Sequence, residues 1–386
     1  MLKKEITFIY SDDVEKQVDE MIAAQAEKRG YSVRLTRDPY AKCEIGWYCQ
    51  HINFPRYSRF SVIMLHDITQ QYGYWPDIWL REPWNKYDIG FLPSLIWKDN
   101  WDQCSQYYYS RPRKGMYLTG WPKADRLAEY SDEQKRKELA LKFGLDPSRR
   151  TVVYAPAWEN DGKQDSFVQS MLNLDVNILV KQAPWPDTYP DQIRNVAEMR
   201  ELHKDIKRVI QLDPKTNILD AIMVSDILVS EESSTMCEAV MLGKPAVSVS
   251  NWMVPFGDKL QYPSDEYDFV VKTKKEDLTD CIRGILEDYG SYEKDAKDYS
   301  AAHFSNIGSC IPMMLDILDA HVNATPAPYS PLEPAEKKSV PFRRNVYHVK
   351  EQINREIYYN YRARSAFVKA LWNILKKIKD AITSKK

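Results

Sequence analysis

Two tracts of this chain carry side chains that could act on a phosphate-containing substrate, and the first centres on a histidine. His66 follows the apolar run from Ser61 to Leu65 in the tract VIMLHDITQQ. A histidine side chain has an unperturbed pKa of about 6.5, so an imidazole at the end of a strand is suited to removing a proton from a substrate hydroxyl. Asp67 could orient the imidazole or cap the next turn. The alternative for His66 is a structural histidine, hydrogen-bonded at the edge of a loop.

The second tract, VSDILVSEESSTMCEAVMLGKPAVSVSNW, runs from Val224 to Trp252. Its pattern predicts a buried strand over residues 226–230, a tight polar turn over 231–234 and a helix over 235–242. A Gly-Lys-Pro sequence then ends the helix, and a second strand follows over 246–250. This order places the free backbone N–H groups of a helix start at the carboxyl end of a strand.

The residues at this helix start are suited to binding an anion. The positive end of the helix dipole favours negative charge there. The hydroxyls of Ser233 and Ser234 add hydrogen-bond donors, and Glu232 and Thr235 flank them. We therefore predict that a nucleotide diphosphate binds at this turn. The alternative is an ordinary helix cap, in which the same residues stabilise only the helix.

Tryptophans are concentrated between Tyr72 and Tyr109, where five of the eleven in the chain occur. Aromatic residues at such density mostly fill cores and interfaces. Their spacing here is irregular, and the functional alternative is a lining for an acceptor sugar or lipid. Trp75 and Trp79 are the candidates for that lining.

Alternating strand and helix patterns must position these residues. In the first half, apolar strand patterns fall at residues 6–10, 32–35, 44–47, 61–65, 88–91 and 116–119. The pattern restarts after residue 150, with strands at residues 151–155, 176–180, 207–210, 227–229 and 246–249. Such alternation predicts an α/β fold with two mostly parallel sheets, each covered by helices. We expect two domains, residues 1–150 and 151–322, with ligands in the cleft between them.

The C-terminal part differs in composition from the rest of the chain. We predict a Pro-rich linker over residues 323–346 and a basic amphipathic helical tail over residues 347–386. From Lys337 to Lys386 the chain has 14 Lys and Arg residues but only 3 acidic residues, within a total net charge of −1. Apolar residues of the tail recur at helical spacing, namely Phe367, Leu371, Ile374, Leu375, Ile378 and Ile382. This pattern fits a helix on an anionic membrane, and the alternative is a helix packed back on the N-terminal domain.

Several classes of function are disfavoured by what the sequence lacks. A chain with an acidic body does not indicate a general nucleic-acid binder. There is no Gly-rich dinucleotide loop, P-loop or D-x-D, and the six cysteines show no metal-binding spacing, so we expect neither a cofactor nor a metal. With no signal peptide and no spanning apolar run, we expect a cytoplasmic protein, peripheral at the inner face of the membrane.

Four tracts, in order through most of residues 60–310, resemble the CDP-glycerol glycerophosphotransferase family of teichoic acid and capsule synthesis. LHDITQQ is similar to the family's His-Gly-Thr-Pro tract, and TGWPKADRL to its Gly-x-Pro-Arg-x-Asp stretch. VVYAPAWEND is similar to a strand ending Tyr-Ala-Pro-Thr-Trp, and VSDILVSEESSTMCEAVMLGKP to the family's Ser-Asp-Tyr-Ser-Ser segment through to Lys-Pro. The resemblance implies the GT-B fold, in which two Rossmann-like domains face each other and the C-terminal one binds the nucleotide donor.

The resemblance implies roles for the matching residues. His66 would be the base that removes the proton of the acceptor hydroxyl, and Ser233 and Ser234 would contact the donor diphosphate. Glu238 stands where the family has Asp, one helical turn on, and would meet the ribose or a neighbouring group. Arg126, in TGWPKADRL, would lie in the acceptor region.

The chain departs from the family after the strand that matches residues 177–180. The family has a second His there, in an Arg-x-His tract, and this chain has VKQAPW instead. Lys181 could supply positive charge to a phosphate, and Gln182 replaces the proton-active group. The Thr-Pro-Leu-Lys part of the first family tract is also absent. The resemblance also implies that Pro156 and Trp158, in VVYAPAWEND, would lie at the edge of the cleft between the two domains.

The predicted function is metal-independent transfer of a glycerol-phosphate-like polyol phosphate, or of a sugar, from a nucleotide diphosphate donor. The donor is CDP-linked, or alternatively UDP-linked, and the acceptor is a hydroxyl of a cell-surface glycan or of its lipid-linked primer. The segment SEESSTMCEAVMLGKP is also similar to the non-hydrolysing UDP-N-acetylglucosamine 2-epimerases, so an epimerase-like enzyme is one alternative. A non-catalytic nucleotide-binding protein is the other, because the second His is absent.

Overall fold

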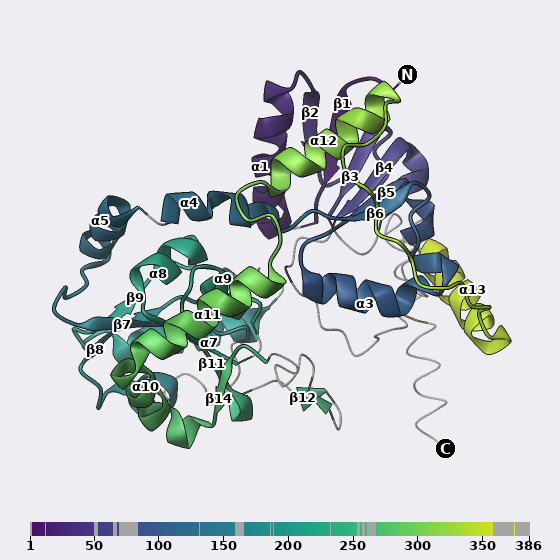
Figure 1. The fold of residues 1–386 in the computed structure, drawn as a ribbon. Coiled ribbons are helices and arrows are strands. Elements are labelled where there is room, and N and C mark those ends of the chain that lie inside the picture. The colour runs from purple at the N-terminus through teal and green to yellow at the C-terminus, as the bar shows by residue number, and fades with distance from the viewer. Residues whose placement is uncertain are drawn as a thin grey trace, which may run out of the picture.

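The structure is a computed structural model that describes residues 2–11, 13–49, 53–64, 68, 84–130, 132–158, 166–185, 187, 189–231, 233–252, 255–256, 259–260, 268–357 and 374. Within these residues the chain forms two six-stranded parallel sheets flanked by helices (Figure 1). A short antiparallel pair, β12 (Pro255–Phe256) and β13 (Lys259–Leu260), stands apart from both sheets. The predicted α/β fold with two parallel sheets is confirmed.

The first sheet has the strand order β2-β1-β3-β4-β5-β6, and all its neighbouring strands are parallel. The strands are β1 (Glu5–Ile9), β2 (Ser32–Thr36), β3 (Cys43–Tyr48), β4 (Ser58–Met64), β5 (Ile89–Leu92) and β6 (Gly115–Leu118). Helices α1 (Asp13–Lys28) and α12 (Cys310–Asn323) pack on one face, and α3 (Leu95–Ser105) packs on the other. The central strands are apolar on both sides because helices cover both faces.

Three tryptophans of the aromatic tract belong to the core of this first sheet. Trp84, Trp97 and Trp101 are fully buried, and the rings of Trp84 and Trp97 stack with centroids 6.4 Å apart. The Ser94 hydroxyl begins α3 by accepting a hydrogen bond from the backbone N–H of Trp97. These three side chains fill the core, as aromatic residues at this density usually do.

The second sheet has the strand order β14-β11-β10-β7-β8-β9 and is also parallel throughout. The strands are β7 (Arg150–Tyr154), β8 (Val176–Val180), β9 (Val209–Gln211), β10 (Ile227–Ser230), β11 (Ala246–Val249) and β14 (Val271–Thr273). One face packs against α8 (Ile218–Val224), α9 (Thr235–Met241) and α11 (Tyr289–His303). The other face packs against α6 (Ser166–Met171), α7 (Pro190–His203) and α10 (Leu278–Glu287).

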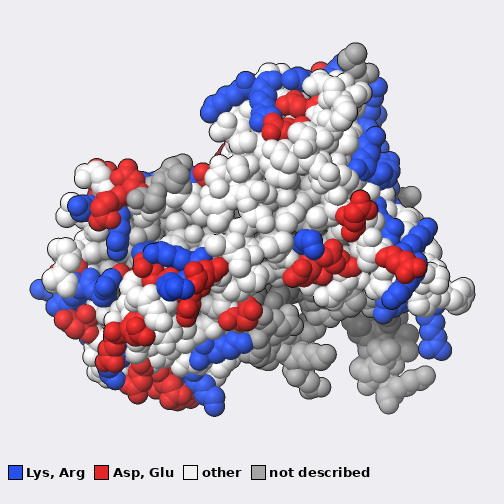
Figure 2. Space-filling view, in the orientation of Figure 1, with Lys and Arg blue, Asp and Glu red and all other residues white. Residues whose placement is uncertain are grey.

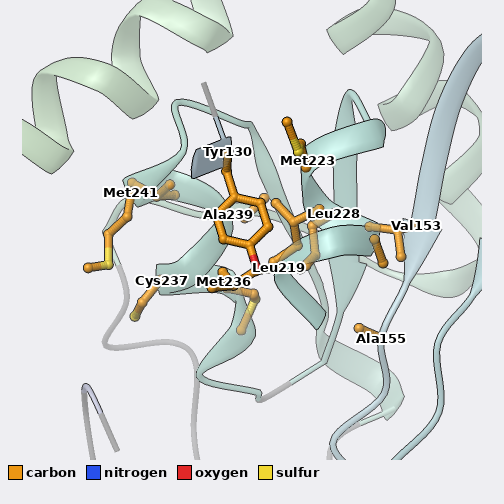
Figure 3. Packing of buried hydrophobic residues seen from close by; sticks show 14 of the residues in the cluster. Tyr130, Val153, Ala155, Leu219, Met223, Leu228, Met236, Cys237, Ala239 and Met241 are labelled. Carbon is orange, nitrogen blue, oxygen red and sulfur yellow. The ribbon is translucent and has the colours of Figure 1, made fainter. Parts of the chain in front are cut away.

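A shared hydrophobic cluster joins the two halves of the chain. It includes residues of the connecting helices α4 (Leu127–Tyr130) and α5 (Glu133–Phe143) together with residues of α8 and α9. Figure 3 shows the ring of Tyr130 lying over Leu219 and Ala239. The amide Nδ2 of Asn217 donates to the Tyr130 hydroxyl over 3.4 Å. The connection between the sheets is therefore packed against the second sheet.

The chain returns to the first sheet after α11, and the 3₁₀ helix η4 (Pro122–Arg126) fixes the crossing point. Both carboxylate oxygens of Asp125 accept hydrogen bonds, one from Cys310 N and one from Ile311 N, each over 2.7 Å. This carboxylate satisfies two of the free N–H groups at the start of α12. Gly120 has φ +90°, and a Cβ there would lie 2.4 Å from Ser305 O. The domain boundaries at residues 150 and 322 stay predictions. Helix α12 lies almost wholly within the predicted second domain, residues 151–322, but packs on the first sheet.

After α12 the chain runs along the first half before the last described helix, α13 (Phe342–Ile357). Leu332 N donates to Met116 O of β6 over 2.7 Å, and Lys338 N donates to Gln106 O over 2.9 Å. The apolar stripe predicted for the tail lies outside the described residues except for Ile374, which is exposed. Among the helices that can be described, none is long and apolar enough to cross a bilayer.

Candidate functional site

The polar turn predicted to bind a diphosphate lies at the carboxyl edge of the second sheet. Strand β10 ends at Ser230 and helix α9 begins at Thr235. The hydroxyl of Ser233 accepts from Thr235 N over 3.3 Å and from Thr235 Oγ1 over 3.0 Å. Ser234 precedes the helix directly, and its hydroxyl makes no capping hydrogen bond. Its side chain is half-buried and stands beside the free N–H groups of the helix start.

Glu231 organises this turn, a role that the sequence did not reveal. Its carboxylate is fully buried, and Oε1 accepts from Ala157 N over 3.1 Å and from Trp158 N over 3.2 Å. Its own carbonyl accepts from the Ser248 hydroxyl over 2.7 Å. A buried carboxylate is stabilised by such N–H donors. The loop after β7, with Pro156 and Trp158, is thereby held against the turn before α9.

An aromatic group stands beside this loop. The ring of Trp158 lies 5.2 Å from that of Trp185, which in turn lies 5.3 Å from the ring of Tyr189. The three rings follow the carboxyl ends of β7 and β8, and Tyr189 is exposed. Trp158 was predicted at the edge of the cleft, whereas Trp185 and Tyr189 were not singled out. Their signal in the sequence was only that each lies a few residues beyond a strand end.

Lys181 lies at the carboxyl end of β8 and is buried. Its Nζ donates to Gln182 O over 2.8 Å and to Pro214 O over 2.9 Å. Burial lowers the pKa of the Lys181 ammonium to about 8, although the carboxylates of Glu238 and Asp213 oppose that effect. Gln182, which replaces the family's second His, is also fully buried and places Nε2 3.3 Å from the sulfur of Met199.

Glu238 lies on α9, one helical turn beyond Ser234, and its side chain is buried. Its Oε1 is 3.8 Å from Nζ of Lys123, which belongs to η4 in the first half of the chain. The Lys123 ammonium also lies 5.0 Å from the centre of the Trp121 ring. Glu238 therefore stands between two lysines, Lys123 and Lys181. Lys123 occupies the place of the Arg in the family's Gly-x-Pro-Arg-x-Asp stretch, and that match was the signal that could have identified it.

Arg126 packs against the aromatic residue that joins the two halves. Its guanidinium lies 5.6 Å from the centre of the Tyr130 ring. This places Arg126 beside the connection between the sheets, and its role in the acceptor region stays a prediction.

The other predicted site residues, His66, Asp67, Trp75, Trp79 and Glu232, lie outside the described residues. Strand β4 ends at Met64, and Ile68 is buried with its carbonyl accepting from the Ser94 hydroxyl over 2.9 Å. In the part of the chain that is described, no group of three His, Cys, Asp or Glu side chains could hold a metal ion.

A family model and a curated protein match the sequence. Residues 81–253 match the family described as CDP-Glycerol:Poly(glycerophosphate) glycerophosphotransferase. A teichoic acid glycerol-phosphate transferase from Staphylococcus aureus (strain NCTC 8325 / PS 47) is 26% identical over 154 residues. That alignment covers 39% of this chain and 39% of the relative, so the chain matches well under half of that protein.

Solved structures share the fold. The wall teichoic acid polymerase TagF superposes with a TM-score of 0.60 at 14% identity, covering 83% of this chain and 89% of that chain. UDP-GlcNAc 2-epimerase from Neisseria meningitidis superposes with a TM-score of 0.51 at 14% identity, covering 80% of this chain and 82% of that chain. A glycosyltransferase from Rickettsia africae superposes with a TM-score of 0.51 at 11% identity, covering 84% of this chain and 99% of that chain.

The structural matches confirm the GT-B-like fold, and the sequence matches confirm the resemblance drawn from the four tracts. The matched segment contains η4, the connecting helices and the turn before α9. Over residues 81–253, a little under half of its length, this chain is similar to the CDP-glycerol glycerophosphotransferase family.

Proposed function

We propose that this chain is a transferase. It moves a glycerol-phosphate-like polyol phosphate, or a sugar, from a nucleotide diphosphate donor to a hydroxyl of a cell-surface glycan or of a lipid-linked acceptor. The family match over residues 81–253 carries the proposal. A CDP-linked donor is favoured, because the family is named for one and a TagF crystal was soaked with CDPG. A UDP-linked donor is the second possibility.

The reaction with a polyol phosphate donor needs one base and a site for a charged leaving group. The acceptor oxygen forms a bond to the phosphorus that carries the polyol, and the bond from that phosphorus to the bridging oxygen of the diphosphate breaks. The nucleoside monophosphate leaves, and the acceptor proton passes to His66. Asp67 orients the imidazole. Catalysis of this kind depends on positioning and on stabilising the charge of the transferring and leaving phosphates.

The donor is proposed to bind at the carboxyl edge of the second sheet. The diphosphate meets the start of α9, where Ser233, Ser234 and Thr235 lie with the neighbouring Glu232, and the ribose meets Glu238. Two observations support this placement: the Ser234 hydroxyl makes no capping hydrogen bond, and Glu231 holds Pro156 and Trp158 against the turn. The Nζ of Lys181 already donates to two carbonyl oxygens. We therefore expect Lys181 to act on the donor phosphates through its positive charge and not through a direct hydrogen bond.

The acceptor is proposed to bind on the side of the first sheet. Trp75 and Trp79 would line its site, with Arg126 near the connection between the halves. The basic tail, residues 347–386, would hold the protein at an anionic membrane on the cytoplasmic face, where a lipid-linked acceptor is presented.

A ligand panel and a transfer assay test the proposal. At a fixed concentration, a tighter ligand raises the melting temperature more, so CDP, CMP, UDP and GDP are compared by thermal shift with the intact protein. We expect CDP to give the largest shift, and Ser234→Ala to reduce it. Transfer is measured with labelled CDP-glycerol and a lipid-linked primer. Protein that binds none of the four nucleotides would contradict the proposal.

An epimerase-like reaction is the second candidate, favoured by the structural likeness to UDP-GlcNAc 2-epimerase. An epimerase acts on free UDP-sugar without an acceptor. Incubation with the donor alone, followed by analysis of the sugar, separates the two reactions. A non-catalytic protein would bind nucleotide and turn over neither donor.

A further inference from the structure

Aromatic side chains follow β8 in the tract where the CDP-glycerol glycerophosphotransferase family has its second His. Gln182, which replaces that His, is fully buried, and its amide Nε2 lies 3.3 Å from the sulfur of Met199 on α7. Trp185 and Tyr189 come next in the chain, and their rings join that of Trp158. We call these three side chains the aromatic group. The tract therefore offers ring surfaces to a ligand where the family offers a proton-active side chain.

The three rings of the aromatic group contact one another directly. The ring centroids lie 5.2 Å apart for Trp158 and Trp185, 5.3 Å for Trp185 and Tyr189, and 6.5 Å for Trp158 and Tyr189. Rings at these distances leave no space for a flat base between them, so a ligand must meet their outer surface. Tyr189 is 41% exposed, and the two tryptophans are half-buried. Among the described residues, the indole N–H of Trp185 has no acceptor, which leaves a donor for a ligand hydroxyl.

The aromatic group and Glu238 belong to opposite faces of the second sheet. Glu238 lies on α9, which packs on one face, and Tyr189 directly precedes α7, which packs on the other. The turn before α9 stands at the carboxyl edge between them, and Glu231 in this turn accepts from Trp158 N over 3.2 Å. A donor whose ribose meets Glu238 and whose diphosphate meets this turn therefore extends its transferred group toward the aromatic group.

The described charges that flank the aromatic group in the chain are mainly acidic. Asp187 is exposed between Trp185 and Tyr189, and Asp191 lies in the first turn of α7. Arg194 is 3.5 Å from Asp191 and pairs with it. Figure 2 shows acidic and basic side chains intermixed over the described surface of the second half that faces the viewer. A chain of phosphates would need a basic surface, so a neutral group is favoured as the ligand of these rings.

A sugar ring suits this surface better than an open polyol does. The C–H groups on one face of a pyranose form an apolar surface that packs on an aromatic ring, and its hydroxyls stay at the edge for hydrogen bonds. Tryptophan and tyrosine combine an apolar face with a polar edge, so they can make both kinds of contact. Glycerol has no such face and would gain little from three rings.

We propose that the aromatic group binds the transferred group of the donor, and that this transferred group contains a sugar ring. The inference rests on the proposed function for the positions of the diphosphate and the ribose. Within that function it selects a sugar over a glycerol-like polyol.

The test measures dissociation constants of the intact protein by isothermal titration calorimetry. The probes are CDP, CDP-glycerol and CDP-glucose, together with UDP and UDP-glucose. For the base that binds more tightly, we expect the glucose conjugate to bind about fivefold or more tighter than the bare diphosphate. CDP-glycerol should gain less over CDP than the glucose conjugate gains over its own diphosphate.

Variants of the exposed tyrosine assign this gain to the rings. Tyr189→Ala should remove most of the gain and leave the affinity for the bare diphosphate within about twofold of the natural protein. Tyr189→Phe keeps the ring and should keep the gain. The matched control is Tyr329→Ala, because Tyr329 is 38% exposed and lies beyond α12, so neither affinity should change. Melting of each variant without ligand shows that it is folded.

Two results would overturn the inference while leaving the proposed function in place. The first is a gain for CDP-glycerol as large as that for the glucose conjugate, which would indicate an open polyol. The second is an equal loss of affinity for the bare diphosphate and the conjugate in Tyr189→Ala, which would place the nucleoside on the rings. Binding of none of the five probes would instead contradict the proposed function, and the inference with it.

Discussion

Lys123 and Glu238 form an ion pair between the two halves of the chain, with Nζ 3.8 Å from Oε1. Lys123 follows the last strand of the first sheet, and Glu238 lies on the helix that starts at the proposed diphosphate site. Both side chains are largely buried. Glu238 is the carboxylate proposed to bind the ribose, and Lys123 belongs to the half proposed to bind the acceptor. Donor binding at Glu238 could therefore change the contact between the two halves of the chain.

Replacing Lys123 tests this pair. Lys123→Gln leaves a buried carboxylate with one cation fewer, so we expect the free energy of unfolding to fall by about 1–3 kcal/mol. The KM for the donor should rise as well, because Glu238 loses a group that positions it. Lys297→Gln removes an exposed pair with Glu293 and should change stability little. Equal effects of the two substitutions would contradict a special role for Lys123.

Replacing His66 tests the proposed base. His66→Ala should lower kcat by about 100-fold or more, because an alanine cannot take the acceptor proton. The thermal shift with the nucleotide should stay unchanged, since the proposed donor site lies on the second sheet. Single-turnover transfer and thermal shift are measured on the same protein. A variant that keeps most of its rate would remove His66 from the mechanism.

Glu231 is expected to matter for both stability and donor binding. In Glu231→Gln the amide cannot match the strength of the charged hydrogen bonds to Ala157 N and Trp158 N, so stability should fall by about 1–3 kcal/mol. The loop after β7 would loosen and the donor KM would rise.

The control for Glu231 is Asp226, a buried carboxylate just before β10 at the opposite edge of the sheet. It accepts from Thr151 N and from Arg150 Nη1, each over 2.8 Å. Asp226→Asn should also destabilise the protein but leave the donor KM unchanged. A rise of the donor KM in both variants would mean that general loosening, and not the site, is responsible.

Lys181 predicts a dependence of stability on pH. Its pKa in the folded protein is about 8, below the ordinary value of 10.5, so the unfolded chain binds more protons between these two pH values. Stability contributed by this residue therefore rises as the pH rises from about 8 to about 10.5, by up to about 3 kcal/mol. The difference in unfolding free energy between the natural protein and Lys181→Met isolates this effect. A difference that is flat across this range would refute the lowered pKa.

Local patterns were enough to predict the two sheets. Ten of the twelve described strands of these sheets have four to seven residues, as in Ser58–Met64, and most are apolar runs bounded by polar or turn residues. Strands β9 and β14 have only three residues, and β14 was not predicted. The strand–turn–helix order at Ser233 and Ser234 is encoded in consecutive residues. Such features depend on neighbours along the chain, so they can be read without knowing the fold. The family tracts are local for the same reason.

Contacts between distant segments could not be read in this way. The sequence contained Lys123, Glu231 and Glu238, but which groups each would meet depends on how the halves pack. The crossing of α12 back to the first sheet likewise depends on Asp125 reaching Cys310 N and Ile311 N, far along the chain.

The sequence by itself determined the α/β class, the polar turn at the start of α9 and the resemblance to the glycerophosphotransferase family, because each is encoded in short stretches of residue types. Only the tertiary structure decided that Glu231 fixes the loop after β7, that Glu238 faces Lys123, and that apolar residues of α13 such as Val346 and Ile353 stay exposed. In the last case the periodicity of the helix gives an apolar face but no direction. The direction is set by Tyr107 and Tyr109, which bind the polar face of the helix.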